Sequence, residues 1–185
     1  RSRGLGDVYK RQGIDVNSHL RKYIIAAAAI ITIIAAAAVL LPRSGYYLTL
    51  RNRDTGEVYA RYKMGEGDRF SVTFIHSVNK YPLTDTYEIE NKTIYVEETT
   101  YCSFGAGVQT ELNPGETLDK VYVDRPDYKG WAMVIRNIHQ DRTNVGYIVG
   151  TVSDHVLNVN GEDVSLRDLC GKNAPVPVSY THLRA

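Results

Sequence analysis

Hydrophobic residues are spaced in two different ways along this chain, and each spacing predicts a different structure. Residues 23–41 form an uncharged apolar run that is preceded by the basic pair Arg21 and Lys22. At about 1.5 Å per residue, a helix of this length reaches nearly the ~30 Å of a bilayer core. Because a backbone inside lipid must satisfy its own polar groups, the run predicts one transmembrane helix.

The charges beside this run predict its orientation. Basic residues favour the cytoplasmic side, so we expect residues 13–22 to form a short cytoplasmic N-terminus and the chain after Arg43 to be extracytoplasmic. A cleaved signal peptide is the alternative, since Ala36 and Ala38 form an A-x-A pattern. The apolar core is longer than in most cleaved signals, which favours a retained signal anchor over secretion.

From Gly45 onward, short runs of β-branched and aromatic residues alternate with turn residues, which is typical of strands. The predicted strands are residues 46–52, 57–63, 69–76, 85–90, 93–101, 120–124, 131–138, 146–149 and 155–159. Residues 165–169 favour a short helical turn. Because long crossover helices are absent, about nine short strands predict an all-β domain, either an antiparallel sandwich or a partly open barrel, over residues 44–175.

Both ends of the chain resemble translated adapter sequence. Residues 1–12 and 176–185 are therefore predicted to be non-native, and we exclude them from the fold. The formal net charge of the whole chain is +1, and it becomes negative once these ends are left out. An acidic domain without a long basic run is a poor partner for phosphate backbones, which argues against nucleic acid binding.

The domain contains two cysteines, Cys102 and Cys170. An extracytoplasmic location permits a disulfide between them, which would contribute about 4 kcal/mol in the chain-entropy model. Two buried free thiols are the alternative.

Ionisable residues occur at the ends of several apolar strand faces. Alternation places His76 on the inward face of its strand, and it puts Asp85 and Glu98 in phase with apolar neighbours on the next two strands. Because a buried charge needs a partner, these residues, together with Arg136, predict a polar cluster at one end of the sheet. The alternative is a histidine that simply donates to a carboxylate and joins two loops.

Several short motifs, taken in order, resemble a known family. They are GDRF at 67–70, FIHSV at 74–78, Pro82, ET at 98–99 and SFGAG at 103–107. The combination resembles the bacterial domain of unknown function 1850. The resemblance implies a short membrane-tethered or secreted protein, encoded beside TRAP transporters of the TAXI type, with an accessory role in solute uptake and no assigned activity.

The chain departs from the family pattern at two places. Thr84 and Asp85 stand where a pair of glutamates is usual, so Asp85 is the only carboxylate carried over, and Val108-Gln109 replaces Leu-Pro.

The SFGAG segment has its own physical interpretation. Gly105 and Gly107 permit backbone conformations in which successive N–H groups, with Ser103 beside them, form an anion-binding concavity. A simple turn after a strand is the alternative. Ser77 is a sequence neighbour of His76, but adjacent strand residues point to opposite faces, so the two are badly placed to exchange a proton.

Other chemistries lack their usual spacing. No G-x-S-x-G elbow or metal-ligand spacing occurs, so we expect no cofactor and no metal, and a binding domain is favoured over an enzyme. The leading hypothesis is a membrane-anchored extracytoplasmic accessory domain that contacts transporter subunits or a solute receptor. The alternatives are a small envelope hydrolase using His76 with Asp85 or Glu98, and a purely structural envelope module.

Overall fold

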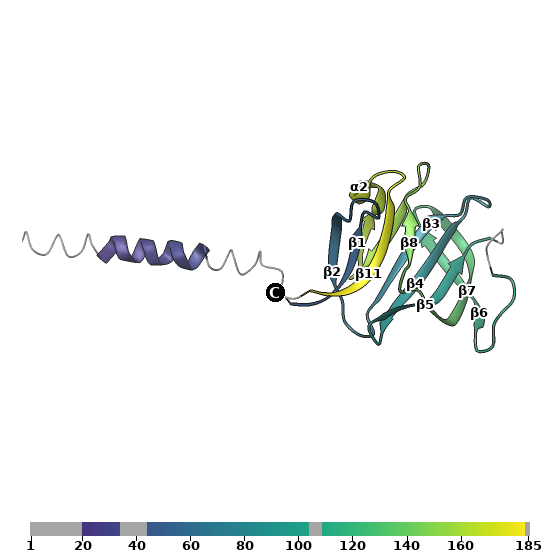
Figure 1. The fold of residues 1–185 in the computed structure, drawn as a ribbon. Helices are drawn as coiled ribbons and strands as arrows, with labels where there is room; N and C mark the ends of the chain where they lie inside the picture. Colours follow the sequence, from purple (N-terminus) through teal and green to yellow (C-terminus); the bar gives the residue numbers. More distant parts are fainter. Residues whose placement is uncertain (1–19, 34–43, 104–108, 184–185) are drawn as a thin grey trace, which may run out of the picture. The chain divides into compact units, whose positions relative to one another are not determined.

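The computed structural model describes residues 20–33, 44–103 and 109–183. The chain divides into two units, residues 1–43 with 185 and residues 44–184, and each is considered separately. In the first unit residues 20–33 form a helix (Figure 1). Among the residues described, no helix is both long and apolar enough to cross a bilayer. Residues 34–41 of the predicted transmembrane run lie outside the described residues, as do residues 1–19.

The second unit is all-β and antiparallel, as predicted, within its described residues. Its strands are β1 (Gly45–Arg51), β2 (Val58–Lys63), β3 (Arg69–Ile75), β4 (Pro82–Glu90), β5 (Thr93–Tyr101), β6 (Thr117–Arg125), β7 (Tyr128–Asp141), β8 (Gly146–Ile148), β9 (His155–Val159), β10 (Glu162–Ser165) and β11 (Pro175–Leu183). The predicted helical turn is α2 (Leu166–Cys170), which Ser165 caps by accepting a hydrogen bond from the Asp168 N–H.

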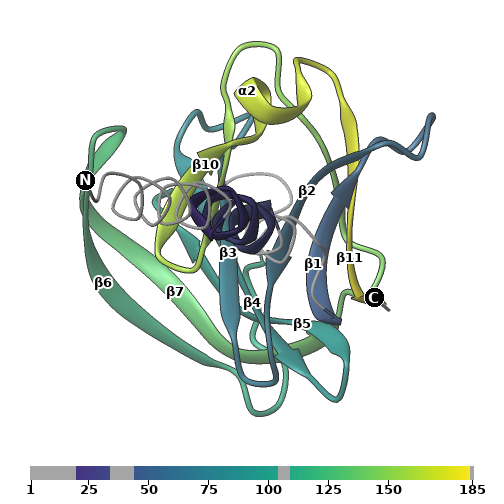
Figure 2. The ribbon, with the colours of Figure 1, turned by 90° about the vertical axis from the view of Figure 1, so that its left-hand side faces the viewer.

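The strands form two sheets. One sheet has the order β2-β1-β11-β8, and the other has the order β10-β9-β3-β4-β5-β7-β6. The second sheet is strongly curved. Figure 2 shows β6 and β7 sweeping around one side of the domain, with β1 and β11 on the opposite side. The architecture is thus a two-sheet domain.

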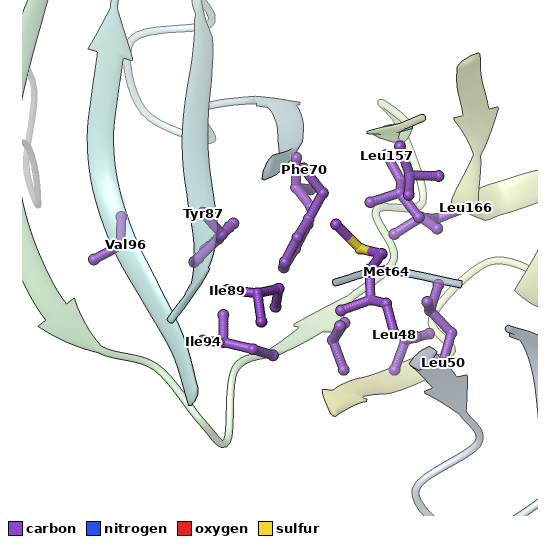
Figure 3. Packing of buried hydrophobic residues seen from close by; sticks show 14 of the residues in the cluster. Leu48, Leu50, Met64, Phe70, Tyr87, Ile89, Ile94, Val96, Leu157 and Leu166 are labelled. Atoms are coloured by element: carbon purple, nitrogen blue, oxygen red, sulfur yellow. The ribbon is translucent and has the colours of Figure 1, made fainter. Parts of the chain in front are cut away.

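The main core lies between the two sheets. Leu48 and Leu50 of β1 are fully buried and face the side chains of the larger sheet, among them Phe70 and Ile89 (Figure 3). The Phe70 ring stacks on Tyr87 with 4.9 Å between ring centroids. Alternating inward residues on both sheets therefore supply most of the apolar surface that folding buries.

Two strands were not predicted. β10 pairs with β9 across a tight turn in which Asn160 and Gly161 both have positive φ. The sequence prediction assigned residues 160–163 to a turn and therefore missed the returning strand.

The larger correction concerns the C-terminal segment. Residues 176–185 were excluded from the fold, but Pro175–Leu183 forms β11 in the interior of the smaller sheet, between β1 and β8. Val176 and Val178 are buried in the main core. Excluding the segment was wrong for the fold because a strand is held largely by backbone hydrogen bonds, which any residue except proline can donate.

Candidate functional site

A cavity of about 790 Å³ lies on the inner face of the larger sheet, beside the main core. Its walls come from the end of β3, the first half of β4, the middle of β5, the second half of β7 and the loop of residues 150–153 that follows β8. Val152 of this loop is 92% exposed and marks the mouth.

Among the described residues that line this cavity, Asp85 is the one carboxylate. It faces inward from β4 and is paired across the ladder with Thr99, whose hydroxyl donates a 2.7 Å hydrogen bond to Asp85 Oδ1. Burial raises the pKa of Asp85, while the Thr99 hydrogen bond, the positive charge of Arg142 and a hydrogen bond with the Tyr87 hydroxyl act in the opposite direction. The carboxyl group is thus held in a poorly solvated place beside two hydroxyl groups.

Two tyrosines lie beside this carboxylate. The hydroxyl groups of Tyr87 on β4 and Tyr147 on β8 are 2.6 Å apart and share a hydrogen bond. Burial, followed by the charge of Asp85, raises the pKa of Tyr87. Because β8 belongs to the smaller sheet, this bond joins the two sheets beside the cavity.

Two histidines also line the cavity. His155 stacks on Phe74 with 5.2 Å between centroids, and its Nδ1 accepts a 3.3 Å hydrogen bond from the Gly150 N–H. Burial lowers the pKa of His155. His76 Nδ1 accepts a 3.3 Å hydrogen bond from the Val78 N–H. With Nδ1 as acceptor, the neutral form of each ring carries its proton on Nε2 and can donate there.

The permanent positive charges of the cavity lining are Arg142 and Lys80, both exposed. Arg142 follows β7, and its backbone N–H donates to the Ile94 carbonyl at 2.7 Å. Its guanidinium donates a 2.8 Å hydrogen bond to Gln140 Oε1, which also lines the cavity. The site therefore has cations near solvent and a carboxylate deeper within.

Three predicted site residues do line this cavity, namely His76, Ser77 and Asp85. His76 lies one residue beyond the end of β3 and is among the residues that line the cavity.

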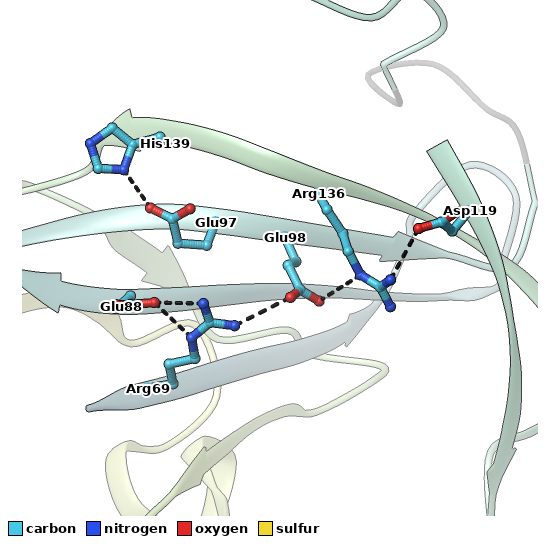
Figure 4. A network of polar contacts seen from close by, with 7 residues as sticks. All are labelled: Arg69, Glu88, Glu97, Glu98, Asp119, Arg136 and His139. Atoms are coloured by element: carbon cyan, nitrogen blue, oxygen red, sulfur yellow. Dashed lines mark hydrogen bonds and ion pairs between the residues drawn. The ribbon is translucent and has the colours of Figure 1, made fainter. Parts of the chain in front are cut away.

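Glu98 and Arg136 do not join them. They belong to a network of ion pairs that is shown in Figure 4. Arg69 bridges Glu88 at 2.6 Å and Glu98 at 3.2 Å, while Arg136 contacts Glu98 at 3.6 Å and Asp119 at 3.0 Å.

A β-bulge explains why the prediction for Glu98 was wrong. The register between β4 and β5 shifts after Val96, so that Val96 pairs with Tyr87 and Glu98 pairs with Thr86. Glu97 is the extra residue. Because a bulge shifts the alternation by one position, Glu98 turns to the face opposite Val96, and Thr99 takes the inward place.

The remaining predicted residues lie away from the cavity lining or outside the description. The Ser103 carbonyl accepts a 2.8 Å hydrogen bond from the Asn79 side chain, which ties the start of the SFGAG segment to the loop after β3. Gly105 and Gly107 lie outside the described residues, so the predicted anion-binding loop stays a prediction.

The disulfide between Cys102 and Cys170 is not formed, and both thiols are free. Cys102 lies near Arg125 and Asp127, whereas Cys170 ends α2, near Asp154. Burial raises the pKa of each thiol to about 11. Protonated, partly buried thiols behave as small apolar groups.

Sequence reasoning missed several groups of this site. Thr99 was hidden by the bulge, and Arg142 and Gly150 come from loops whose positions no local pattern indicates. Tyr87 could have been found, because it stands in phase with Asp85 on the same strand. Among the residues that the structure describes, no group of three or more His, Cys, Asp or Glu side chains is arranged to hold a metal ion.

The fold and the cavity define a class of protein, that of small antiparallel β-domains with a cavity of mixed polar and apolar lining beside the core. The family model of the domain of unknown function DUF1850 matches residues 70–166, just over half of the chain, and the chain belongs to this family. The matched segment runs from β3 to the start of α2 and contains all of the described residues that line the cavity. No curated protein and no solved structure matches the chain.

Proposed function

We propose that this protein is an extracytoplasmic binding domain, held at the cell membrane by its N-terminal helix, that assists a TRAP-type solute transporter. The observation that carries the proposal is the cavity of about 790 Å³ that contains Asp85. Small-molecule sites in proteins have volumes of about 300–1,000 Å³ and combine apolar walls with a few polar groups.

The composition of the walls supports a binding role. Phe74, Leu83, Val96 and Ile138 contribute apolar surface, whereas Asp85 and the cationic side chains near the mouth contribute charge. Charged groups that are kept in a cavity at a cost in solvation usually serve a ligand or a reaction.

The location rests on the N-terminal segment. The apolar run of residues 23–41 and the basic pair before it favour a membrane anchor with the β-domain outside the cytoplasm. Secretion after cleavage of the same segment is the alternative. The link to a TRAP-type transporter comes from the resemblance to transporter-associated family members.

Photocrosslinking in intact cells tests the transporter link. A photoreactive amino acid is placed at Val152, at the cavity mouth, in the full chain. A matched control carries it at Glu90, the exposed last residue of β4, away from the cavity lining. We expect the Val152 probe to capture a transporter subunit or a solute receptor, identified by mass spectrometry. Absence of any such adduct, or equal yields from both positions, would contradict the proposal.

A small envelope hydrolase is the second candidate, and one observation favours it. His76 and Asp85 line the same cavity. In this role, Asp85 and His76 would act as acid and base. The test is the pH profile of any turnover detected with ester or amide substrates. A profile that is unchanged in His76→Ala would exclude this role.

A further inference from the structure

We propose that the cavity binds a small organic acid whose carboxylate is accompanied by a hydrogen-bond donor, an ammonium or a hydroxyl group, on the neighbouring carbon. This inference rests on the proposed binding function and names the ligand class. Arg142 and Lys80 take the carboxylate, and Asp85 takes the donor.

The outer part of the cavity is suited to an anion. Arg142 and Lys80 carry its permanent positive charges. The 2.8 Å hydrogen bond to Gln140 uses one of the five donors of the Arg142 guanidinium and fixes its orientation. A guanidinium held in this way matches the two oxygens of a carboxylate, with which arginine forms paired hydrogen bonds.

The inner part of the cavity is suited to a donor. Asp85 Oδ1 accepts a hydrogen bond from Thr99 at 2.7 Å. A carboxylate has lone pairs for about four hydrogen bonds, and burying it without donors is costly. Thr99 and the Tyr87 hydroxyl use part of this capacity, and an ammonium or hydroxyl group of a ligand would use the rest.

Arg142 and Asp85 interact electrostatically, so the two ligand groups that they bind must also lie close together. Arg142 lies near enough to Asp85 to stabilise its charged form. A carboxylate and a donor on adjacent carbons therefore suit this pair better than groups separated by a long chain.

His155 does not alter this division of charge. Burial favours the neutral form of His155, and its Nδ1 already accepts from the Gly150 N–H. The permanent positive charges that attract the anion are those of Arg142 and Lys80. The apolar residues Phe74 and Ile138 are left to contact a hydrocarbon body.

A matched panel of compounds tests the inference on the full chain in detergent micelles. The compounds within a set share one hydrocarbon body. The first set consists of leucine, 2-hydroxy-4-methylpentanoate, 4-methylpentanoate and 3-methylbutylamine. Phenylalanine, 3-phenyllactate, 3-phenylpropanoate and 2-phenylethylamine form the second. Dissociation constants are measured by isothermal titration calorimetry.

We expect the amino acid or the hydroxy acid of at least one set to bind about tenfold more tightly than the two compounds that lack one group, since each of those two compounds loses hydrogen bonds to a charged partner, and a tenfold difference corresponds to about 1.4 kcal/mol. A preference for the amino acid identifies an ammonium donor, and a preference for the hydroxy acid identifies a hydroxyl donor.

Three isosteric or charge-removing variants locate the effect. Arg142→Gln should remove the preference for compounds with a carboxylate, and Asp85→Asn should remove the preference for compounds with a donor. Arg136→Gln, in the network of Figure 4, is the control and should change neither. Circular dichroism verifies that each variant is folded.

Several results would overturn the inference. The first is that 3-methylbutylamine binds as tightly as leucine, and 2-phenylethylamine as tightly as phenylalanine. The second is that the ligand preferences are unchanged in Asp85→Asn. The third is that Arg136→Gln loses as much affinity for the carboxylate compounds as Arg142→Gln does. If no compound binds while the Val152 crosslink to a transporter component persists, the ligand class is wrong and the proposed function stands. If the crosslink is also absent, both are wrong.

Discussion

Asp85 lies where a carboxylate is costly for the fold, and we propose that it serves a ligand there. It is poorly solvated and receives a hydrogen bond from Thr99, and its pKa is raised by burial. The folded state therefore binds more protons than the unfolded state between pH 3.8 and the higher folded pKa. Its contribution to stability is present below pH 3.8 and is lost as the pH rises through the folded pKa.

Asp85→Asn should consequently stabilise the protein at neutral pH while it weakens binding. The asparagine oxygen can still accept the Thr99 hydrogen bond, and the buried charge is gone. We expect a higher free energy of unfolding at pH 7 and a flatter pH dependence above pH 3.8. Urea unfolding monitored by circular dichroism at several pH values measures both. A less stable variant at pH 7 would contradict this account.

Tyr87 and Tyr147 illustrate the cost of leaving a buried hydroxyl group without a hydrogen-bond partner. Their 2.6 Å hydrogen bond satisfies two buried hydroxyl groups at once. Tyr87→Phe leaves the Tyr147 hydroxyl without this partner and should lower the free energy of unfolding by about 1–3 kcal/mol. The double variant Tyr87→Phe/Tyr147→Phe removes both hydroxyl groups and should recover part of that loss. A double variant whose loss is the sum of the two single losses would be inconsistent with a direct interaction.

The pairing of β5 with β7 is interrupted on both strands. Val96 pairs with Gln140, and Glu98 pairs with Arg136. Between these two pairs, β5 has one residue, Glu97, and β7 has three, residues 137–139. Two of those three, Asn137 and His139, have positive φ. This double irregularity turns Ile138 toward the cavity and Glu98 away from it.

Substitution at Asn137 tests the importance of this backbone geometry. Its φ of 60° lies in the left-handed region, which a β-branched residue tolerates poorly. Asn137→Val should lower the free energy of unfolding by about 1–2 kcal/mol, whereas Asn137→Gly, the control, should change it by a few tenths. Chemical denaturation of the three proteins makes the comparison. Equal stabilities of the valine and glycine variants would show that strain is unimportant here.

The second prediction at the scale of elements concerns the contribution of β11 to folding. This strand pairs with β1 on one side and β8 on the other. A chain that ends at Ala174 loses both ladders and uncovers Leu48 and Leu50, so we expect it to be unfolded by circular dichroism. Replacing residues 179–183 with other strand-forming residues of the same alternation is the control and should retain the fold. A folded, cooperative chain ending at Ala174 would contradict the importance of this strand.

These comparisons indicate how far local sequence patterns reach. Period-two alternation located β5 and β9 to the residue, and it placed Asp85 in phase with the inward apolar residues of its strand. It placed Glu98 on the wrong face because the bulge at Glu97 belongs to the pairing of β5 with β4 and β7, which the alternation along β5 alone does not indicate. Arg142 was missed because a loop residue has no periodicity, and its place depends on the backbone contact with Ile94.

For the molecule as a whole, the proposal of a membrane anchor is tested by a single charge. Ile31→Arg places a cation in the apolar run, where insertion of an arginine at the centre of a helix costs about 2.5–3.5 kcal/mol. We expect the variant to leave the membrane fraction after alkaline extraction, whereas Ile31→Leu should stay in it. Protease added outside spheroplasts should digest the β-domain of the control chain. Retention of the arginine variant in the membrane would argue against a spanning helix.

Some features of this protein follow from local sequence patterns, and others depend on contacts between distant residues. The apolar run, the alternation of the strands and the turn residues depend on neighbours only a few positions apart, so the all-β class and most strand positions followed from the chain alone. The order of the strands, the central place of β11 and the cavity depend on pairings between distant residues. Asp85, Arg142 and His155 line one cavity because β4, β7 and β9 belong to the same curved sheet, and no local pattern encodes that order of strands.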